Sequence, residues 1–340
     1  MTTPIAVEIC AGAGGQAIGL ERAGFEHAAL VEIDPDACAT LRLNRPEWNV
    51  VECDVRSVRP EEHLAGRRVG LLAGGVPCPP FSVAGQQLGQ DDERDLFPAM
   101  LDLAARISPD ALMVENVRGL LQDRFAAYRA SILQRLKEIG LTPVMWQVLK
   151  ACDFGVPQLR PRSVLVAVKP EYAAHFMPPA PLPGRGATVA AALADSMRAR
   201  GLEGADFEAW AAKAGMPAPT LVGGSKKHGG ADLGPTRARA QWERMGIDAR
   251  SVAEDCEPAT LEGLAGRGPR LTVSQAAVIQ GFPAGWRFSG RKTARYRQIG
   301  NAFPPPVAHA VAGRIREALA VVDGRAVESE CGHAGAVAAA

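Results

Sequence analysis

The sequence predicts an α/β fold in which a mostly parallel sheet is covered by helices and joined to a smaller second domain. In the first 170 residues, short apolar runs alternate with longer amphipathic stretches, as they do where helices connect parallel strands. From residue 179 to 268 this pattern stops, and Pro and Gly clusters replace it. A chain of 340 residues has room for both parts.

Each apolar run in the first part ends at turn or helix residues, so we expect each run to be a strand. The predicted strands are residues 5–9, 28–32, 50–53, 69–73, 111–115, 144–149 and 164–168. A helical pattern resumes after Leu271, and the prolines at 304–306 lead into a final helix at 307–322. We therefore divide the chain into a first domain at 1–178, a second domain at 179–268 and a return to the first domain at 269–322. The tail at 323–340 has few large apolar groups, which predicts disorder.

Charge and cysteine content exclude several classes of protein. The 38 Lys and Arg residues nearly balance 37 Asp and Glu, so the chain is not basic throughout, but no acid lies between Glu262 and Glu317, and that stretch suits a polyanion. Seven cysteines without a C-x-x-C pair argue against a disulfide framework or a zinc ribbon, and we expect no metal. Without a membrane-length apolar run or a signal peptide, the expected location is the cytoplasm.

A Gly-rich loop follows the first predicted strand and precedes a helix. Its glycines let the backbone approach a ligand closely, and the helix start offers free N–H groups. The second apolar run ends at Glu32, about 20 residues after the loop, where an acid can bind ribose hydroxyls. The third is followed by Asp54, which is placed to meet an adenine amino group. Dinucleotide enzymes and S-adenosylmethionine enzymes both show this pattern, and a turn without a ligand remains an alternative.

Cys78 follows the fourth predicted strand, between Pro77 and Pro79. Open α/β sheets bind ligands at this edge, and the prolines fix the backbone that presents the thiol. We therefore interpret Cys78 as a nucleophile and the other six cysteines as small buried side chains. The polar loop that follows, residues 83–95, is expected to be a mobile lid, with an ordinary surface loop as the alternative.

Glu115 ends the fifth predicted strand. In a partly dry cleft its carboxyl can donate a proton to a ring nitrogen, although an exposed Glu at the start of a turn is the simpler interpretation. Arg160 and Arg162 are two positions apart, so both guanidiniums are expected on one side of an extended segment. There they could bind a carbonyl oxygen, a carboxylate or phosphates.

Taken in order, these pieces resemble the DNA (cytosine-5) methyltransferase family, of bacterial restriction-modification or orphan type. The resemblance covers nearly the whole chain outside about 180–265. It is carried by Ala11-Gly12-Ala13-Gly14-Gly15, Glu32 with Asp34, Asp54, Pro77-Cys78 with Phe81-Ser82, Glu115-Asn116-Val117, Gln158-x-Arg160-x-Arg162, Arg270-Leu271-Thr272 with Gln280-Gly281-Phe282-Pro283, and Gln298-Ile299-Gly300-Asn301-Ala302 with Pro304-Pro305. It implies a Rossmann-like methyltransferase fold with a target recognition domain at 179–268. It also implies transfer of the methyl group of S-adenosylmethionine to carbon 5 of a cytosine flipped out of a specific duplex DNA sequence.

The resemblance also assigns roles. Cys78 would add to carbon 6 of the cytosine, Glu115 would hold and protonate ring nitrogen 3, and Arg162 would bind the ring oxygen, with Arg160 supporting the pocket. The cofactor pocket would consist of Ala11, Gly12, Gly14, Gly15, Glu32, Asp54, Pro77, Leu96 and Asn301. Two residues depart from the family pattern. Cys10 replaces a Phe, which puts cofactor affinity in doubt, and Pro79 replaces a Gln, which puts local loop contacts in doubt.

Partners follow from the same resemblance. Double-stranded DNA is the expected partner, with a cognate restriction endonuclease as a second candidate, and we expect a monomer that does not bind membranes. The expected DNA contacts are Ser82, Lys226, Lys227, Arg237 and Arg239, each with a solvated loop as its alternative. Trp210 and Trp242 have apolar neighbours at helical spacing and are expected in the core. The recognised bases cannot be derived from these residues.

Three other functions remain as alternatives. A tRNA cytosine-5 methyltransferase would use the same scaffold, but the large recognition segment favours DNA. A nicotinamide-dependent dehydrogenase would explain the Gly-rich turn and Glu32, yet it leaves Cys78, Glu115 and the two arginines unexplained. A catalytically silent DNA-binding module conflicts with the presence of both Cys78 and Glu115.

Overall fold

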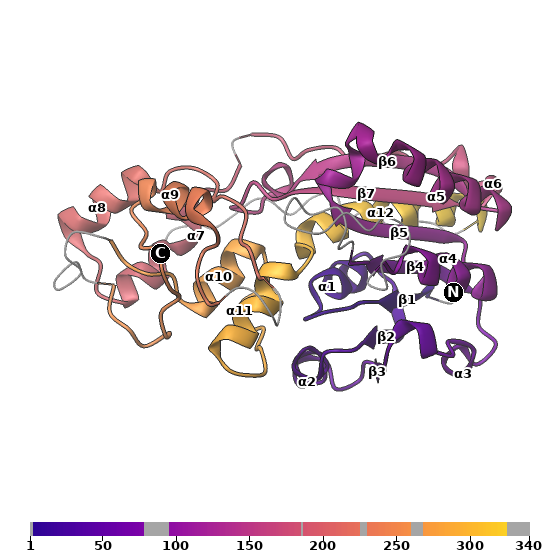
Figure 1. Cartoon of the computed structure of the whole chain (residues 1–340), viewed down its shortest axis with the longest axis horizontal. Coiled ribbons are helices and arrows are strands. Elements are labelled where there is room, and N and C mark those ends of the chain that lie inside the picture. Colours follow the sequence, from indigo (N-terminus) through magenta and orange to yellow (C-terminus); the bar gives the residue numbers. More distant parts are fainter. Residues whose placement is uncertain (1–2, 78–94, 185, 225–229, 260–267, 325–340) are drawn as a thin grey trace.

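A seven-stranded sheet forms the centre of the larger lobe, and all seven predicted runs are strands (Figure 1). The computed structural model describes residues 3–77, 95–184, 186–224, 230–259 and 268–324. The strands are β1 Ile5–Ile9, β2 Glu26–Glu32, β3 Val50–Glu52, β4 Val69–Gly75, β5 Ala111–Val117, β6 Thr142–Lys150 and β7 Pro161–Val168. The predicted α/β fold is therefore confirmed.

The sheet has the order β3-β2-β1-β4-β5-β7-β6. Its first five strands are parallel, while β7 lies antiparallel to both β5 and β6. The reversal follows from chain length, because only ten residues join β6 to β7. A segment that short permits an antiparallel pair, whereas a parallel pair needs a crossover connection. The sheet is thus mostly parallel, as predicted.

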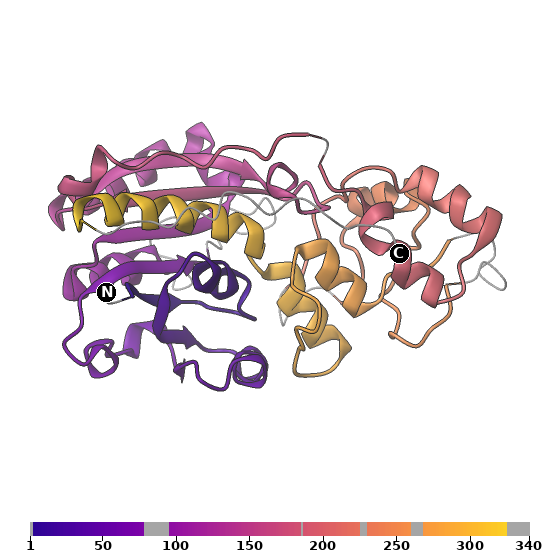
Figure 2. The ribbon, with the colours of Figure 1, turned by 180° about the vertical axis from the view of Figure 1, so that it is seen from behind.

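Helices cover both faces of the sheet. On one face lie α4 Phe97–Ile107 and α5 Ala126–Glu138, and on the other lie α1 Gly15–Arg22, α6 Pro170–Ala173 and α12 Pro305–Val322. Figures 1 and 2 show α12 running along the second face. Gly19 allows α1 and α12 to touch, since a Cβ there would lie 2.5 Å from that of Ala308. The end of the chain is therefore packed against its beginning.

The smaller lobe is helical in its described part. It contains α7 Val189–Ala199, α8 Gly204–Lys213 and α9 Thr236–Arg244, while α10 Val273–Gln280 and α11 Lys292–Asn301 lie between the lobes (Figure 1). Trp210 and Trp242 are buried in its core, as predicted. One hydrophobic cluster runs from Trp242 through Ile279 to Trp286 and Ile18, so the core is continuous between the lobes.

The remaining elements are one helix of ten residues and several single turns. They are α2 Pro35–Asn44, α3 Glu61–Leu64 and 3-10 turns at Val55–Ser57, Arg118–Leu121, Asp123–Phe125 and Ala151–Phe154. Asp34 caps α2 by accepting a hydrogen bond from the Asp36 N–H, and Pro35 opens the helix. The described part of the chain contains no helix long and apolar enough to cross a bilayer. Residues 325–340, most of the predicted tail, lie outside the described residues.

Candidate active site

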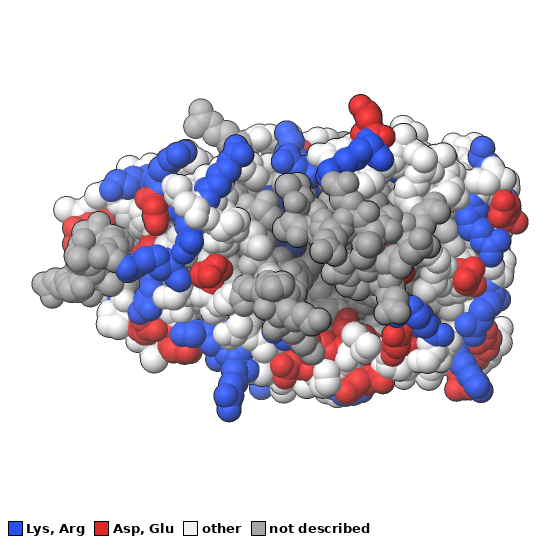
Figure 3. Space-filling view, in the orientation of Figure 1, with Lys and Arg blue, Asp and Glu red and all other residues white. Residues whose placement is uncertain are grey.

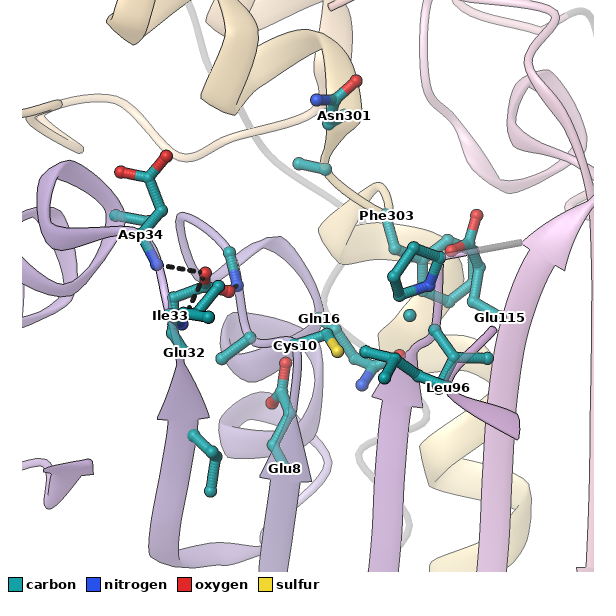
Figure 4. Close-up of a pocket in the computed structure, with 18 of the residues that line it drawn as sticks. Glu8, Cys10, Gln16, Glu32, Ile33, Asp34, Leu96, Glu115, Asn301 and Phe303 are labelled. Atoms are coloured by element: carbon teal, nitrogen blue, oxygen red, sulfur yellow. Dashed lines mark hydrogen bonds between the residues drawn. The ribbon is translucent and has the colours of Figure 1, made fainter. Parts of the chain in front are cut away.

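A cavity of about 700 Å³ lies at the carboxyl ends of the parallel strands. Its wall takes residues from the loop after β1, the ends of β2, β4 and β5, and α11. Figure 4 shows Glu32 and Glu115 on opposite sides of it. Open α/β sheets bind their ligands at this edge, and the volume is in the range of small-molecule sites.

Glu32 ends β2 and is held by three backbone groups. Its Oε2 accepts a hydrogen bond of 2.8 Å from the Gly12 N–H, and its Oε1 accepts from Ile33 and Asp34 at 2.8 and 2.7 Å (Figure 4). A carboxylate has roughly four acceptor positions, so one remains for a ligand hydroxyl. The loop after β1 and the end of β2 therefore present one oriented acceptor to the cavity.

The glycines of the loop have different functions. Gly12 and Gly15 line the cavity, but Gly14 does not. Gly14 has a φ of 88°, and a Cβ on it would lie 2.8 Å from Leu41 Cδ2 and 3.0 Å from Trp286. Gly14 therefore makes the left-handed turn and packs against α2 and Trp286, and its contact with the cofactor stays a prediction.

The other predicted cofactor residues all reach the cavity wall: Ala11, Asp54, Pro77, Leu96 and Asn301. The Asp54 carboxylate accepts two hydrogen bonds from Arg56, from its backbone N–H at 2.9 Å and from its Nη1 at 3.1 Å. Asn301 donates from Nδ2 to the Gly224 carbonyl at 3.2 Å. The cavity wall is thus tied to the segment that follows Leu221 in the smaller lobe.

Glu115 and Arg162 form an ion pair at the other side of the cavity. Arg162 Nε donates to Glu115 Oε1 at 2.7 Å, and both side chains are nearly buried. Gly75 gives this carboxyl room, since a Cβ there would approach Glu115 Oε2 to 3.2 Å. Burial lowers the pKa of the Arg162 guanidinium, and the Glu115 carboxylate opposes this shift. The pair offers a carboxyl and a cationic donor to one ligand.

The guanidiniums of Arg160 and Arg162 do not lie together, contrary to the expectation that both point to one side of an extended segment. The φ of Arg160 is 21°, so the backbone is left-handed there and the alternation of an extended segment does not apply. Its guanidinium is buried and donates to the carbonyls of Leu221, Gly300 and Ala302 at 2.8–2.9 Å. Arg160 therefore joins three backbone segments and does not line the cavity.

Cys78 and Ser82 lie outside the described residues, as does the rest of the predicted lid up to residue 94. The described chain on either side of that gap reaches the cavity at Pro77 and Leu96. Asn116 donates to the Val76 carbonyl at 3.1 Å, and Asp95 accepts hydrogen bonds from the Phe97 N–H and the Tyr128 hydroxyl. Both attachment points are thus fixed to the sheet lobe.

Two of the predicted DNA contacts, Lys226 and Lys227, also lie outside the described residues. Arg237 is exposed and Arg239 is half-buried, both on α9. Figure 3 shows Lys and Arg side chains gathered over the smaller lobe and acidic side chains along the lower edge of the molecule. In that view, Lys and Arg side chains outnumber the acidic ones over the upper part of the smaller lobe.

Sequence reasoning assigned no role to several polar residues of the cavity wall, among them Glu8, Gln16, Arg56 and Arg297. An acid inside an otherwise apolar strand was a usable signal for Glu8. Among the cysteines, Cys38 is buried as predicted, but Cys10 lines the cavity and Cys256 is exposed. The prediction for Cys256 is wrong because that residue lies in a turn at the surface.

Comparison with known proteins identifies the family. The family model of C-5 cytosine-specific DNA methylases matches residues 6–195 and 227–317. The chain belongs to that family. The methylase is 56% identical over 317 residues to the type II methyltransferase M.NaeI of Lentzea aerocolonigenes. That alignment covers 92% of this chain and 75% of the relative. It is 50% identical over 316 residues to the type II methyltransferase M.NgoMIV of Neisseria gonorrhoeae. Here the alignment covers 92% of this chain and 97% of the relative.

Solved structures agree with the fold. The methylase superposes with a TM-score of 0.65 on an Escherichia coli prophage protein described as a DNA modification methyltransferase. The two are 21% identical, and the match covers 93% of this chain and 99% of that chain. This likeness bears on the fold alone.

The methylase is a DNA (cytosine-5) methyltransferase, and its methyl donor is S-adenosylmethionine. The predicted function is confirmed over the tRNA and dehydrogenase alternatives. The residues present fit this cofactor, because the cavity of about 700 Å³ suits a nucleoside with an amino-acid extension and Glu32 has an acceptor position to spare for a ribose hydroxyl.

Proposed function

We propose that this methylase modifies a cytosine flipped out of duplex DNA through a covalent bond between Cys78 and carbon 6 of the ring. The observation that carries the proposal is the Glu115–Arg162 pair, which faces the same cavity as Glu32. The cavity then has one side, at Glu32, that suits a nucleoside, and another side, at Glu115 and Arg162, that suits the polar edge of a pyrimidine. Pro77, the residue before Cys78, lies in its wall.

The chemistry explains the residue types. Carbon 5 of cytosine is a poor nucleophile until the Cys78 thiolate adds to carbon 6, and the negative charge that then spreads into the ring needs a proton or a cation. Glu115 donates the proton to ring nitrogen 3, and Arg162 binds the ring oxygen while its Nε orients Glu115. When bound, S-adenosylmethionine supplies an electrophilic methyl group. Loss of the carbon 5 proton finally expels Cys78 as the thiolate.

The cofactor side of the cavity is assigned to Ala11, Gly12, Gly15, Glu32, Asp54, Pro77, Leu96 and Asn301. In this assignment Glu32 accepts hydrogen bonds from the ribose hydroxyls. Asp54 accepts one from the adenine amino group beside its contact with Arg56. The order of the strands supports it, since Glu32 ends β2, Asp54 follows β3, and these two strands lie side by side.

We assign residues 179–268 to target recognition, with Arg237 and Arg239 among the groups that contact the duplex. The exposure of Arg237 on α9 supports this role. Because relatives are type II methyltransferases, we further propose a cognate restriction endonuclease with the same target. We also propose that the methylase is a monomer that works in the cytoplasm. Sedimentation with and without duplex would test the monomer, and sequencing of methylated plasmid would identify the target.

A mechanism-based trap tests the covalent step. In DNA that carries 5-fluorocytosine in the target, carbon 5 has no proton to lose, so the adduct cannot break down. We expect the wild type and the Cys256→Ser variant, which changes an exposed thiol, to become covalently attached in the presence of S-adenosylmethionine. The Cys78→Ser variant should bind the cofactor and form no adduct. Attachment of Cys78→Ser would contradict the proposal.

A further inference from the structure

Trp286 reaches from the segment after α10, between the lobes, into the loop that follows β1 (Figure 1). Its indole Nε1 donates a hydrogen bond of 3.1 Å to the Ala13 carbonyl, 273 positions earlier in the chain. Ala13 is buried and lines the cavity, whereas Trp286 is buried behind the loop and is not part of the cavity wall. A buried carbonyl needs a donor from the protein, because water does not reach it. Trp286 therefore supports a cavity residue from outside the cavity.

The first half of the loop is anchored to the sheet. The Ala11 N–H donates to a carbonyl of β2 at 3.2 Å, and the Gly12 N–H donates to Glu32 Oε2 at 2.8 Å. The next residue, Ala13, is anchored by Trp286 instead. The course of the loop beyond Gly12 thus depends on a side chain that the sheet does not supply.

The indole ring of Trp286 is itself held in place. The Arg45 guanidinium lies 5.5 Å from the ring centroid, close enough for a cation–π contact, and forms a bidentate ion pair with Glu21 on α1 at 2.8 and 2.9 Å. The Trp48 ring packs 6.1 Å away. The missing side chain of Gly14 leaves room for the indole, since a Cβ there would lie 3.0 Å from Trp286. The indole N–H therefore meets the loop from a fixed position.

The backbone after Trp286 is fastened to α2. The Arg287 N–H donates to Asn44 Oδ1 at 2.9 Å, and Asn44 Nδ2 donates to the Arg287 carbonyl at 2.7 Å. The Ser289 N–H donates to Thr40 Oγ1 at 2.8 Å. The segment that joins α10 to α11 is thus held against the sheet lobe on both sides of the indole contact, by its side chain and by its backbone.

We propose that Trp286 is a positioning residue for S-adenosylmethionine, because it holds the loop after β1 in the conformation that the cofactor meets. The loop residues assigned to the cofactor, Ala11, Gly12 and Gly15, lie on either side of Ala13, whose carbonyl Trp286 fixes. Loss of the N–H donor frees that part of the loop and weakens cofactor binding, while every group that reacts stays in place. This inference rests on the assignment of the cavity to that cofactor.

Calorimetry with S-adenosylhomocysteine, the demethylated product, tests this role without catalysis. Trp286→Phe keeps an aromatic ring and loses the N–H donor, so we expect the dissociation constant to rise about fivefold, as for the loss of one hydrogen bond. Trp48→Phe is the matched control, because it removes an indole from the same cluster but no hydrogen bond to the loop. Its dissociation constant should stay within about twofold of the wild-type value. Unchanged binding by Trp286→Phe, or an equal loss in both variants, would overturn the inference.

Kinetics separate positioning from a general loss of structure. For Trp286→Phe, the KM for S-adenosylmethionine should rise together with the dissociation constant. The single-turnover rate at saturating S-adenosylmethionine should stay within about twofold of the wild-type rate, because the Glu115–Arg162 pair lies at the other side of the cavity. A slower rate at saturation with an unchanged KM would contradict the positioning role.

The wild type offers a readout that decides the question even if Trp286→Phe does not fold. In a nuclear magnetic resonance spectrum, the indole N–H signal of Trp286 should shift when S-adenosylhomocysteine saturates the protein. The signals of Trp210 and Trp242, in the core of the smaller lobe, should stay in place. A Trp286 signal that does not move would overturn the inference. If the ligand does not bind the wild type, the assignment of the cavity fails; if it binds and Trp286→Phe matches the wild type, only the positioning role fails.

Discussion

At the scale of single residues, the acids of the cavity differ in what their neighbours allow them to do. Glu32 is fixed by three N–H groups and suits a neutral hydroxyl partner. Glu115 forms an ion pair with Arg162 and lies in the space left by the missing side chain of Gly75. Glu8 has no such partner within the described chain. Three carboxyls of one cavity therefore have three different sets of partners.

Glu115→Gln should slow methyl transfer by about 10²–10⁴-fold, because an amide cannot donate the proton that the ring needs. Affinity for S-adenosylmethionine should stay near that of the wild type, since Glu115 lies at the opposite side of the cavity from Glu32 (Figure 4). Single-turnover methylation and calorimetry measure the two quantities. Glu138→Gln, an exposed change on α5, is the control. A wild-type rate in Glu115→Gln would remove the acid role.

At the scale of elements, a buried polar junction connects the two lobes. Gln158 accepts from the Leu221 N–H at 2.8 Å and donates to Gln280 Oε1 at 2.8 Å. Arg160 adds its three bonds to carbonyls, including those of Gly300 and Ala302 on either side of Asn301. The segment before β7, the smaller lobe and the cavity wall thus share one set of hydrogen bonds.

Arg160→Met should lower the free energy of unfolding by about 2 kcal/mol or more, because the buried carbonyls of Leu221 and Gly300 lose this donor, while the Ala302 carbonyl keeps the hydrogen bond from Gln280. Denaturant unfolding at constant pH measures the change. Arg135→Met is a suitable control, since Arg135 makes surface ion pairs with Asp102 and Glu138 that should contribute less than about 1 kcal/mol. If the free energy of unfolding fell by the same small amount in both variants, the buried junction would contribute no more to stability than a surface ion pair does.

His27 links β2 to α1 and makes stability depend on pH. Burial lowers the pKa of His27 to about 4, although its Nε2 contacts the Ala17 carbonyl at 3.0 Å, which opposes the shift. The unfolded chain, with a pKa of about 6.5, binds the proton first as pH falls. Folding stability is therefore intact above pH 6.5 and is lost progressively toward pH 4, by about 3 kcal/mol in total from this group.

Unfolding free energies at pH 7 and pH 5 check this prediction. His27→Gln should have a smaller difference between the two pH values than the wild type, whatever its absolute stability. His175→Gln, which changes an exposed side chain, should retain the wild-type difference. An unchanged pH dependence in His27→Gln would show that other groups cause it.

At the scale of the whole molecule, folding breaks up the basic stretch that follows Glu262. Arg270 pairs with Glu257, Lys292 with Glu254, and Arg314 with Glu317 on α12. Helix α12 lies along the sheet lobe, at the other end of the molecule from α9 (Figures 1 and 2). The stretch is therefore not one surface for a polyanion. Exposed cations of the smaller lobe, Arg237 among them, are better placed for DNA.

DNA affinity should fall steeply as salt concentration rises, because each phosphate contact releases counterions. Arg237→Ala should weaken binding and reduce the slope of log affinity against log salt by about 1. Arg314→Ala should leave that slope unchanged, since Arg314 is paired on α12. Fluorescence anisotropy with a labelled duplex at several salt concentrations gives both values. Equal slopes for wild type and Arg237→Ala would remove Arg237 from the interface.

Much of the fold could be read from local patterns. The seven strands, the final helix and the buried Trp210 and Trp242 follow from side-chain periodicity and turn residues, which act over a few positions of the chain. The final helix begins two residues earlier than predicted, at Pro305, since proline is tolerated in the first turn of a helix. The reversal of β7 was not visible in any single apolar run.

The ordered motifs and their spacing were sufficient to predict the family and the cofactor. Those that follow β1, β2 and β5 also predicted the edge of the sheet where the candidate site lies, because each is a contiguous piece of chain at the end of one strand. Which side chains become partners depended on the folded chain. Arg160 turned toward carbonyls more than 60 positions away, Gly14 packed against Trp286, and Glu8 was left without a donor. Hydrogen bonding and burial depend on distances in space between residues far apart in sequence, and only the packed structure sets those distances.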